Sequence, residues 1–242
     1  ARVLDSRTGT GGWNGPLAAG APRDLAVRQP ANPAGVPATA TTVIANVTVT
    51  GATAGSFVSV WPAGLAQPAS SNLNFAAGQT IPNLVIVKIG ANGNIRFANA
   101  VGNVHVIVDI VGYFDATTGS RFHAIAPTRI LDGRVNKGLS GPWGPGQSRA
   151  LAVAGAPGTN IPGAATGLVT NVTATAGTAG SFITVYPDGS PRPNASNLNF
   201  GPGQTIANLV TTKLGATGNI ALYNHTGTVH IIADAHGYYS PT

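Results

Sequence analysis

Two pairs of a histidine and an aspartate are the residues best suited to chemistry in this chain. His105 and Asp109 are four residues apart, as are His230 and Asp234, so on an extended strand both members of a pair point to one face. Such a pair could orient a metal ion, or a base that activates a nucleophile. Neither pair has a third ligand or a nucleophile at a fixed spacing. We therefore expect a buried, satisfied pair, no metal site and no enzyme.

Charged residues recur at six matched positions, which account for 12 of the 20 charged residues. These positions are Arg2/Arg129, Asp5/Asp132, Arg7/Arg134, Arg23/Arg149, Lys88/Lys213 and Asp109/Asp234. Both copies would keep these residues if the fold requires them, or if each copy carries the same binding site. We predict buried Asp109 and Asp234, each paired with an arginine of its own opening motif, because an isolated buried carboxylate is costly and the arginine fork bonds both oxygens. Arg7 and Arg134 are favoured over Arg2 and Arg129.

Four aromatic residues are candidates for stacking on sugar rings. Trp13 and Trp143 follow the two opening motifs in loops rich in glycine and proline, and Trp61 matches Tyr186 on the strand face that also carries Phe57 and Phe182. Flat rings can meet the axial C–H groups of a pyranose. Large aromatic residues also fill cores, which is the alternative role. The carbohydrate-binding candidates are Trp13, Trp61, Trp143 and Tyr186.

The most recognisable repeated stretch is rich in amide side chains. Ser71-Asn-Leu-Asn-Phe75 recurs as Ser196-Asn-Leu-Asn-Phe200, followed in both places by Gly-Gln-Thr-Ile and Asn-Leu-Val. Amides can bind sugar hydroxyl groups, and they also satisfy the backbone of turns and irregular edges. The second role is the more common one.

An internal repeat determines the domain organisation. Residues 36–114 align with 161–239 without a gap, and 42 of the 79 positions are identical. The length of each copy is that of an ordinary domain. We predict one domain over 1–115 and a second over 129–242, joined by a linker over 116–128 in which 120–125 could form a strand.

Alternating apolar and polar residues predict short strands separated by turns. The expected strands are 43–50, 57–61, 71–75, 83–89, 95–97 and 104–111, with Asn92-Gly93 predicting a hairpin before the fifth. Short strands at this spacing favour two antiparallel β-sandwiches of jelly-roll type. The alternative is a closed β-barrel or a β-trefoil-like form.

The segment before the second opening motif has no counterpart before Arg2. If this segment belongs to the fold of the second domain, the first domain has an unpaired strand edge. Exposed edges are templates for pairing with another strand.

Composition limits the partners of the chain. Charged residues make up only 8% of the chain, and its net charge of +6 results from the small number of acidic residues. The basic residues form no run, so we expect no nucleic-acid binding. The positive net charge predicts a weak attraction to anionic polymers. Zero cysteine excludes disulfides and thiolate metal sites. The chain has no run of 18 apolar residues, so we expect no membrane insertion. No signal peptide is visible, so we expect a mature or trimmed chain, and we expect no cofactor.

The order of the motifs resembles a tandem repeat module of exported actinobacterial proteins. The motifs are RVLDxR, NVT, SNLNF, GQT, NLV and VHxIxDxxGY followed by Phe or Tyr. In such proteins the module stands beside peptidases, cell-wall hydrolases and glycoside hydrolases. The resemblance implies a secreted, non-catalytic module pair that binds cell-wall or other polysaccharide. The alternative is a structural extracellular protein that self-assembles into filaments or a surface layer through strand edges and repeat ends.

Overall fold

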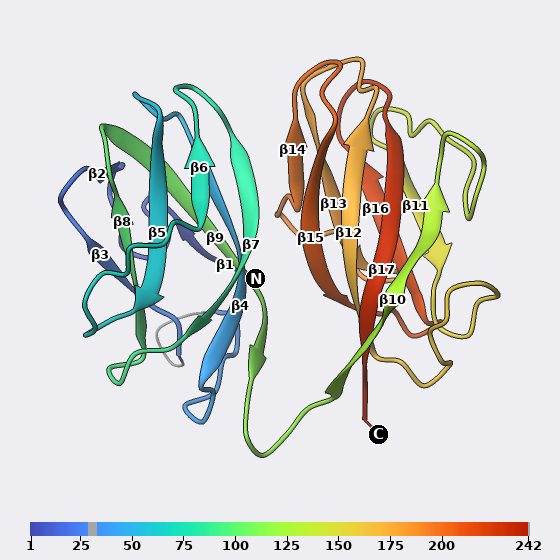
Figure 1. The fold of residues 1–242 in the computed structure, drawn as a ribbon, viewed down its shortest axis with the longest axis horizontal. Helices are drawn as coiled ribbons and strands as arrows, with labels where there is room; N and C mark the ends of the chain where they lie inside the picture. The colour runs from blue at the N-terminus through green and yellow to red at the C-terminus, as the bar shows by residue number, and fades with distance from the viewer. Residues whose placement is uncertain (29–32, 242) are drawn as a thin grey trace. The chain divides into compact units, whose positions relative to one another are not determined.

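The computed structural model describes residues 1–28 and 33–241, and these fold into two compact units, Ala1–Thr118 and Gly119–Thr242. The described residues contain strands and turns but no helix (Figure 1). A high content of glycine and proline and a low content of charged residues disfavour long helices, in agreement with this architecture.

The first unit consists of two antiparallel sheets. One has the strand order β1 (Arg2–Asp5), β9 (Asn103–Phe114), β4 (Thr42–Thr50) and β7 (Ile81–Lys88), and the short β2 (Leu17–Ala18) also pairs with β9. The other has the order β3 (Arg23–Ala26), β8 (Asn94–Asn99), β5 (Ser56–Pro62) and β6 (Leu73–Phe75).

The second unit repeats this arrangement except that none of its described strands corresponds to β2. One sheet has the order β10 (Arg121–Asp132), β17 (His230–Ser240), β12 (Gly167–Thr175) and β15 (Ile206–Lys213). The other has the order β11 (Ser148–Ala152), β16 (Asn219–Asn224), β13 (Ser181–Pro187) and β14 (Leu198–Phe200). In both units the chain passes between the two layers in the order of a jelly roll, so the predicted fold class is confirmed.

Apolar residues at alternate positions form a separate core within each unit. On β4 the inward residues Val43, Ala45, Val47 and Val49 are all buried, and on β9 so are Val104, Val106, Val108 and Ile110. Leu168, Val172 and Ala174 of β12 take the matching places in the second core. The period of two seen in the sequence therefore decides which side chains line each core.

The predicted hairpin at Asn92-Gly93 is wrong. β7 and β8, which flank this turn, belong to different sheets, so the turn connects the two layers of the sandwich. Gly93 has φ of +83°, and the Asn92 side chain accepts a hydrogen bond from the backbone of Asn94. Asn92-Gly93 correctly predicted a tight turn. The same turn can also connect two strands that belong to different sheets.

The segment between the two repeats is largely a strand. β10 pairs with β17 at Arg121–Ala124 and again at Thr128–Asp132, with an irregularity between these stretches. The residues predicted as a linker therefore contribute to the first strand of the second unit.

Candidate functional site

The opening motif of the first unit forms a chain of ion pairs. Arg2 makes two bonds to Asp109, Nε to Oδ1 at 3.0 Å and Nη2 to Oδ2 at 3.1 Å, and it also reaches Asp5 at 3.5 Å. Arg7 instead makes two bonds to Asp5, at 2.9 and 2.7 Å, and donates its backbone N–H to the same carboxylate. These contacts consist of fork-like charge-assisted bonds that fix the start of β1.

The predicted partner of Asp109 was therefore wrong, and so was that of Asp234. Arg2 lies directly opposite Asp109 in the pairing of β1 with β9, whereas Arg7 follows the end of β1 and turns back onto Asp5. The second unit repeats the geometry: Arg129 bonds Asp234 at 2.8 and 3.1 Å, and Arg134 bonds Asp132. Asp109 is buried as predicted, but the Asp234 side chain is 22% exposed.

The environment of each carboxylate sets its pKa. The guanidinium groups of Arg7 and Arg134 lower the pKa of Asp5 and of Asp132, respectively. Burial raises the pKa of Asp109, and the bonds from Arg2 oppose that rise. Every carboxylate of this network has an arginine partner. We therefore interpret the network as a structural connection between the first and the last strand of each unit.

In the described structure the aspartate of each pair bonds an arginine and makes no hydrogen bond to its histidine. His105 Nδ1 lies 3.0 Å from Ser6 Oγ, which also accepts the backbone N–H of Val106. In the second unit Gly133 replaces this serine, and the buried Nδ1 of His230 has no hydrogen-bond partner among the described residues. The expectation of a satisfied histidine–aspartate pair is wrong, since the aspartates bond arginines. The described residues also contain no cluster of three or more histidines and acids that could hold a metal.

The two tryptophans after the opening motifs are buried, so their prediction as sugar platforms is corrected. Trp13 is 4% exposed and Trp143 is fully covered. Their indole N–H groups donate to the backbone oxygens of Asp24 and Leu222, and Arg23 and Arg149 lie over the rings at 4.5 Å. A ring enclosed in this way stabilises the fold and has no free face for a sugar.

Trp61 and Tyr186 also lie beneath other residues. They are 4% and 8% exposed; Trp61 donates to the backbone oxygen of Leu65, and the Tyr186 hydroxyl lies 2.6 Å from Ser148 Oγ. The prediction that these two rings form sugar platforms is therefore corrected as well. The loop after β5 contacts the Trp61 ring through Leu65, and the neighbouring β11 contacts Tyr186 through Ser148.

The amides of the repeated stretch satisfy the backbone. Asn72 Oδ1 accepts the N–H of Val60, and Asn83 donates to the backbone oxygen of Asn72. The same two bonds occur in the second unit through Asn197 and Asn208. This stretch anchors the three-residue strands β6 and β14 to their neighbours.

A cluster of rings on the surface of the second unit was not predicted. Ile183 and Val185 of β13 point into the core, so Phe182 points outward, next to Tyr223 of β16. The Phe182 ring stacks on His225 at 4.6 Å between ring centroids and 22° between planes, and the Tyr223 hydroxyl lies 3.1 Å from His225 Nδ1. We call Phe182, Tyr223, His225 and Arg192 the ring cluster.

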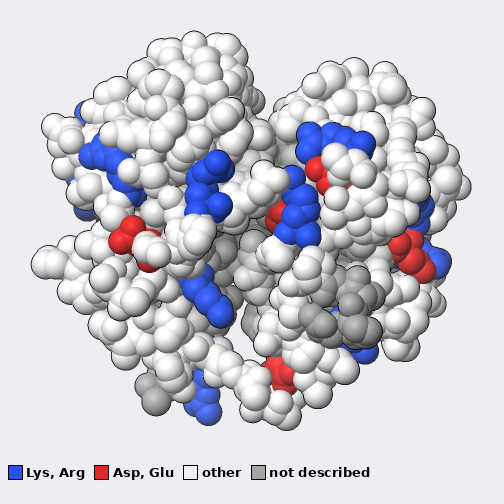
Figure 2. Space-filling view, turned by 180° about the vertical axis from the view of Figure 1, so that it is seen from behind, with Lys and Arg blue, Asp and Glu red and all other residues white. Residues whose placement is uncertain are grey.

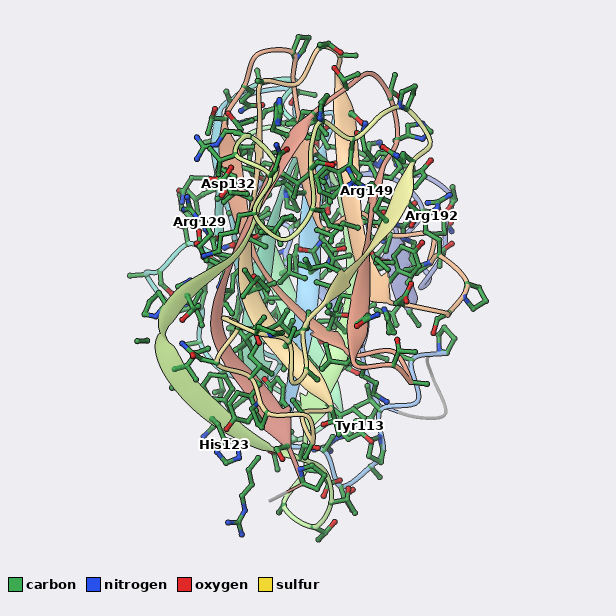
Figure 3. The ribbon with its side chains drawn as sticks, turned by 90° about the vertical axis from the view of Figure 1, so that its right-hand side faces the viewer. Tyr113, His123, Arg129, Asp132, Arg149 and Arg192 are labelled. Carbon is green, nitrogen blue, oxygen red and sulfur yellow. The ribbon has the colours of Figure 1, made fainter. Side chains whose placement is uncertain are left out.

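Arg192 completes the ring cluster from the loop between β13 and β14. Its guanidinium carbon lies 4.2 Å from the centroid of the Tyr223 ring. His225 and Arg192 are exposed, whereas Phe182 and Tyr223 are half-buried. Figure 3 shows Arg192 on the side of the second unit away from Arg129 and Asp132. The cluster is therefore distinct from the ion pairs of the opening motif.

The first unit has no such cluster at the matching positions. Tyr223, His225 and Arg192 correspond to Ala98, Ala100 and Gln67. The same sheet face of the first unit carries an ion pair between Arg96 and Asp24, whose counterparts are alanines in the second unit. The second unit thus presents an uncharged strip beside three rings, and the first presents charges.

On the face shown in Figure 2, lysine and arginine side chains stand in small separate groups, some beside acids. Such scattered charges do not form the basic stripe of a nucleic-acid-binding surface. The described part of the chain holds no long apolar helix of the kind that crosses a bilayer.

Comparison with known proteins gives little guidance. No family model and no curated protein matches the chain. Among solved structures, it is similar to the N-terminal CBM22-1-CBM22-2 tandem domain of Xyn10C from Paenibacillus barcinonensis, with 11% identity, 98% of each chain covered and a TM-score of 0.26. Function must therefore be argued from the geometry of this chain.

Proposed function

We propose that the chain is a secreted, non-catalytic protein that binds polysaccharide through the ring cluster of its second unit. The observation that carries this proposal is the outward-facing stack of Phe182 and His225, flanked by Tyr223 and Arg192. An exposed ring is an apolar surface in contact with water, and the C–H face of a sugar ring can cover it. Hydroxyl, imidazole and guanidinium groups at its rim supply the hydrogen bonds that sugar hydroxyls need.

The strip beside the ring cluster suits a neutral polymer. The exposed Ala150 and the buried Ala221 replace the charged pair of the first unit, so an uncharged ligand beside the rings would not have to remove water from charged groups at these positions. Arg192 adds a positive charge at one end, which favours cell-wall polymers that carry carboxylate or phosphate groups. We propose cell-wall polysaccharide as the ligand class, with attachment or targeting as the role.

Pull-down on insoluble peptidoglycan, chitin and glucans tests the proposal. The chain is expected to sediment with at least one of these polymers, and Phe182→Ala is expected to weaken binding about five- to tenfold, as the loss of one aromatic contact would. Phe57→Ala is the matched control, because Phe57 occupies the same strand position in the first unit, is 36% exposed and lacks the other rings. Equal effects of the two substitutions would contradict the site.

Failure of the whole panel has a different meaning. If the pure protein binds none of these polymers and forms filaments under negative-stain microscopy, self-assembly becomes the better explanation. The absence of product from the same polymers checks that the module is non-catalytic.

A further inference from the structure

Four residues form a row across the second unit, on the face of the β10-β17-β12-β15 sheet that points away from the core. Phe122 of β10 lies opposite Tyr239 of β17. Tyr239 in turn lies opposite Gly167 of β12, and Gly167 lies opposite Lys213 of β15. Leu168, the next residue after Gly167, is in the core, so the alternation of the strand turns the row outward. We call these four residues the outer row.

Two glycines allow the rings of the outer row to lie against the sheet. A Cβ added at Gly237 would come within 2.4 Å of the Phe122 ring, and one added at Gly167 within 3.2 Å of the Tyr239 ring. Each ring therefore covers a glycine and turns its other side away from the sheet. The two ring centroids are 5.5 Å apart, with 54° between the ring planes.

The surface that these two rings present to water is apolar. Phe122 is 49% exposed, and Tyr239 beside it is half-buried. The outer row crosses three strand spacings, about 14 Å, so a ligand that follows it has to be extended rather than compact. An apolar surface of this kind is stabilised when the apolar face of a ligand covers it.

A cation stands at one end of the outer row. Lys213 is exposed and makes no ion pair within the described part of the chain. The two acidic residues of the same sheet already bond arginines, Asp234 to Arg129 and Asp132 to Arg134. The ammonium group of Lys213 therefore favours a ligand that carries a negative group beside its apolar face.

We propose that the outer row binds an acidic polysaccharide, with a sugar ring over Phe122 and Tyr239 and a sugar carboxylate on Lys213. The C–H groups on the face of a pyranose cover the aromatic rings, and the carboxylate pairs with the ammonium group. A neutral sugar lacks the ionic contact, and an acidic peptide lacks the flat C–H face. The outer row and the ring cluster lie on different sheets of the second unit, so the outer row does not depend on the proposed site.

Isothermal titration with oligogalacturonate tests the proposal on the full chain carrying Phe182→Ala, a background in which the ring cluster is weakened. We expect saturable binding, and addition of Phe122→Ala should weaken it about five- to tenfold, because one aromatic contact is lost. Addition of Lys213→Gln should weaken it about two- to fivefold and reduce its dependence on salt. A neutral gluco-oligosaccharide of the same length should bind more weakly than oligogalacturonate.

Two further variants separate the site from a loss of fold. Leu209→Ala is the matched control, because Leu209 is on the same sheet face, is 38% exposed and stands four residues from Lys213 on β15. It should leave binding unchanged. Phe122→Leu keeps an apolar side chain over Gly237, so it should retain the unfolding temperature but bind as weakly as Phe122→Ala.

Four results would overturn the proposal. Equal weakening by Leu209→Ala and Phe122→Ala, or no binding of oligogalacturonate to either the unsubstituted chain or the Phe182→Ala chain, would exclude the outer row as a sugar site. Binding to the unsubstituted chain that is lost in the Phe182→Ala background would assign the acidic sugar to the ring cluster instead. Tighter binding of poly-glutamate, which has carboxylates but no sugar ring, would assign the surface to an acidic peptide.

Discussion

At the scale of single residues, the matched charges act as structural ties. The same three ion pairs occur in both units: the first arginine of Arg-x-x-Asp-x-Arg bonds the aspartate of the last strand, and both arginines bond the aspartate of the motif. The sequence predicted the burial of Asp109 and an arginine partner for it. It could not rank Arg2 above Arg7, because that choice depends on the register between β1 and β9, which local residue types do not determine.

Removing either member of the main pair should destabilise the first unit. We expect Asp109→Ala to lower the free energy of unfolding by about 3–5 kcal/mol, because Arg2 would lose its partner in a largely buried place. Arg2→Ala should have a similar effect, and Arg7→Ala a smaller one, since Arg7 is half exposed. Denaturant unfolding of the three variants measures this. A larger loss from Arg7→Ala than from Arg2→Ala would contradict the assigned pairing.

Acid should weaken the opening motifs. The pKa values of Asp5 and Asp132 are lowered in the folded state, so their ionised forms add stability above the unfolded pKa of about 4, and this stability is lost as the pH falls through the folded pKa. We expect thermal stability to fall below about pH 4. Asp132→Asn should be less stable at neutral pH and show a flatter pH profile for the second unit. Identical profiles for variant and wild type would exclude this role.

At the scale of elements, the shortest strands depend on side chains that bond backbone. β14 has only three residues, and Asn197 supplies the N–H of Val185 with an acceptor. We expect Asn197→Ala to cost about 1–3 kcal/mol, because it leaves a buried donor without a partner. Asn199→Ala, two residues along, loses only a bond to Ser196 and should cost less. Chemical denaturation measures the stability loss of both variants. Equal losses would contradict a special role of Asn197 in holding β14.

The limits of prediction are also visible at this scale. Alternation located the strands over 43–50 and 104–111, because one buried face imposes a period of two. The turn at Asn92-Gly93 was found, but whether its flanking strands pair depends on the layer order of the whole sandwich. The burial of Trp61 likewise depends on the path of the loop at Leu65, and that of Tyr186 on the neighbouring strand β11, and the alternation within a single strand specifies neither.

At the scale of the whole molecule, the repeat predicted the matching strand orders of the two units. The charged residues that both copies retain form structural ion pairs. The ring cluster occurs in one copy only, so the match between the copies gives no signal for Tyr223, His225 and Arg192. The available signal was Phe182, because the alternation that turns Ile183 and Val185 into the core turns Phe182 outward.

Each unit should respond to damage in its own core. The buried residues form two separate clusters, one in each unit. Leu168→Ala, at a fully buried site, is expected to destabilise the second unit by about 2–5 kcal/mol. Hydrogen exchange followed by mass spectrometry should show lost protection within 119–242 and little change within 1–118. Equal loss in both units would show that they fold as one cooperative body.

The proposal that the ring cluster binds polysaccharide is tested most directly by NMR titration of the full chain with soluble oligosaccharides from a polymer that retains it. The account predicts shift changes at Phe182, Tyr223, His225 and Arg192, with no change at Phe57 or at the buried indoles of Trp13 and Trp143. Shift changes centred on the first unit, or a binding polymer whose oligosaccharides leave these four residues unmoved, would contradict it.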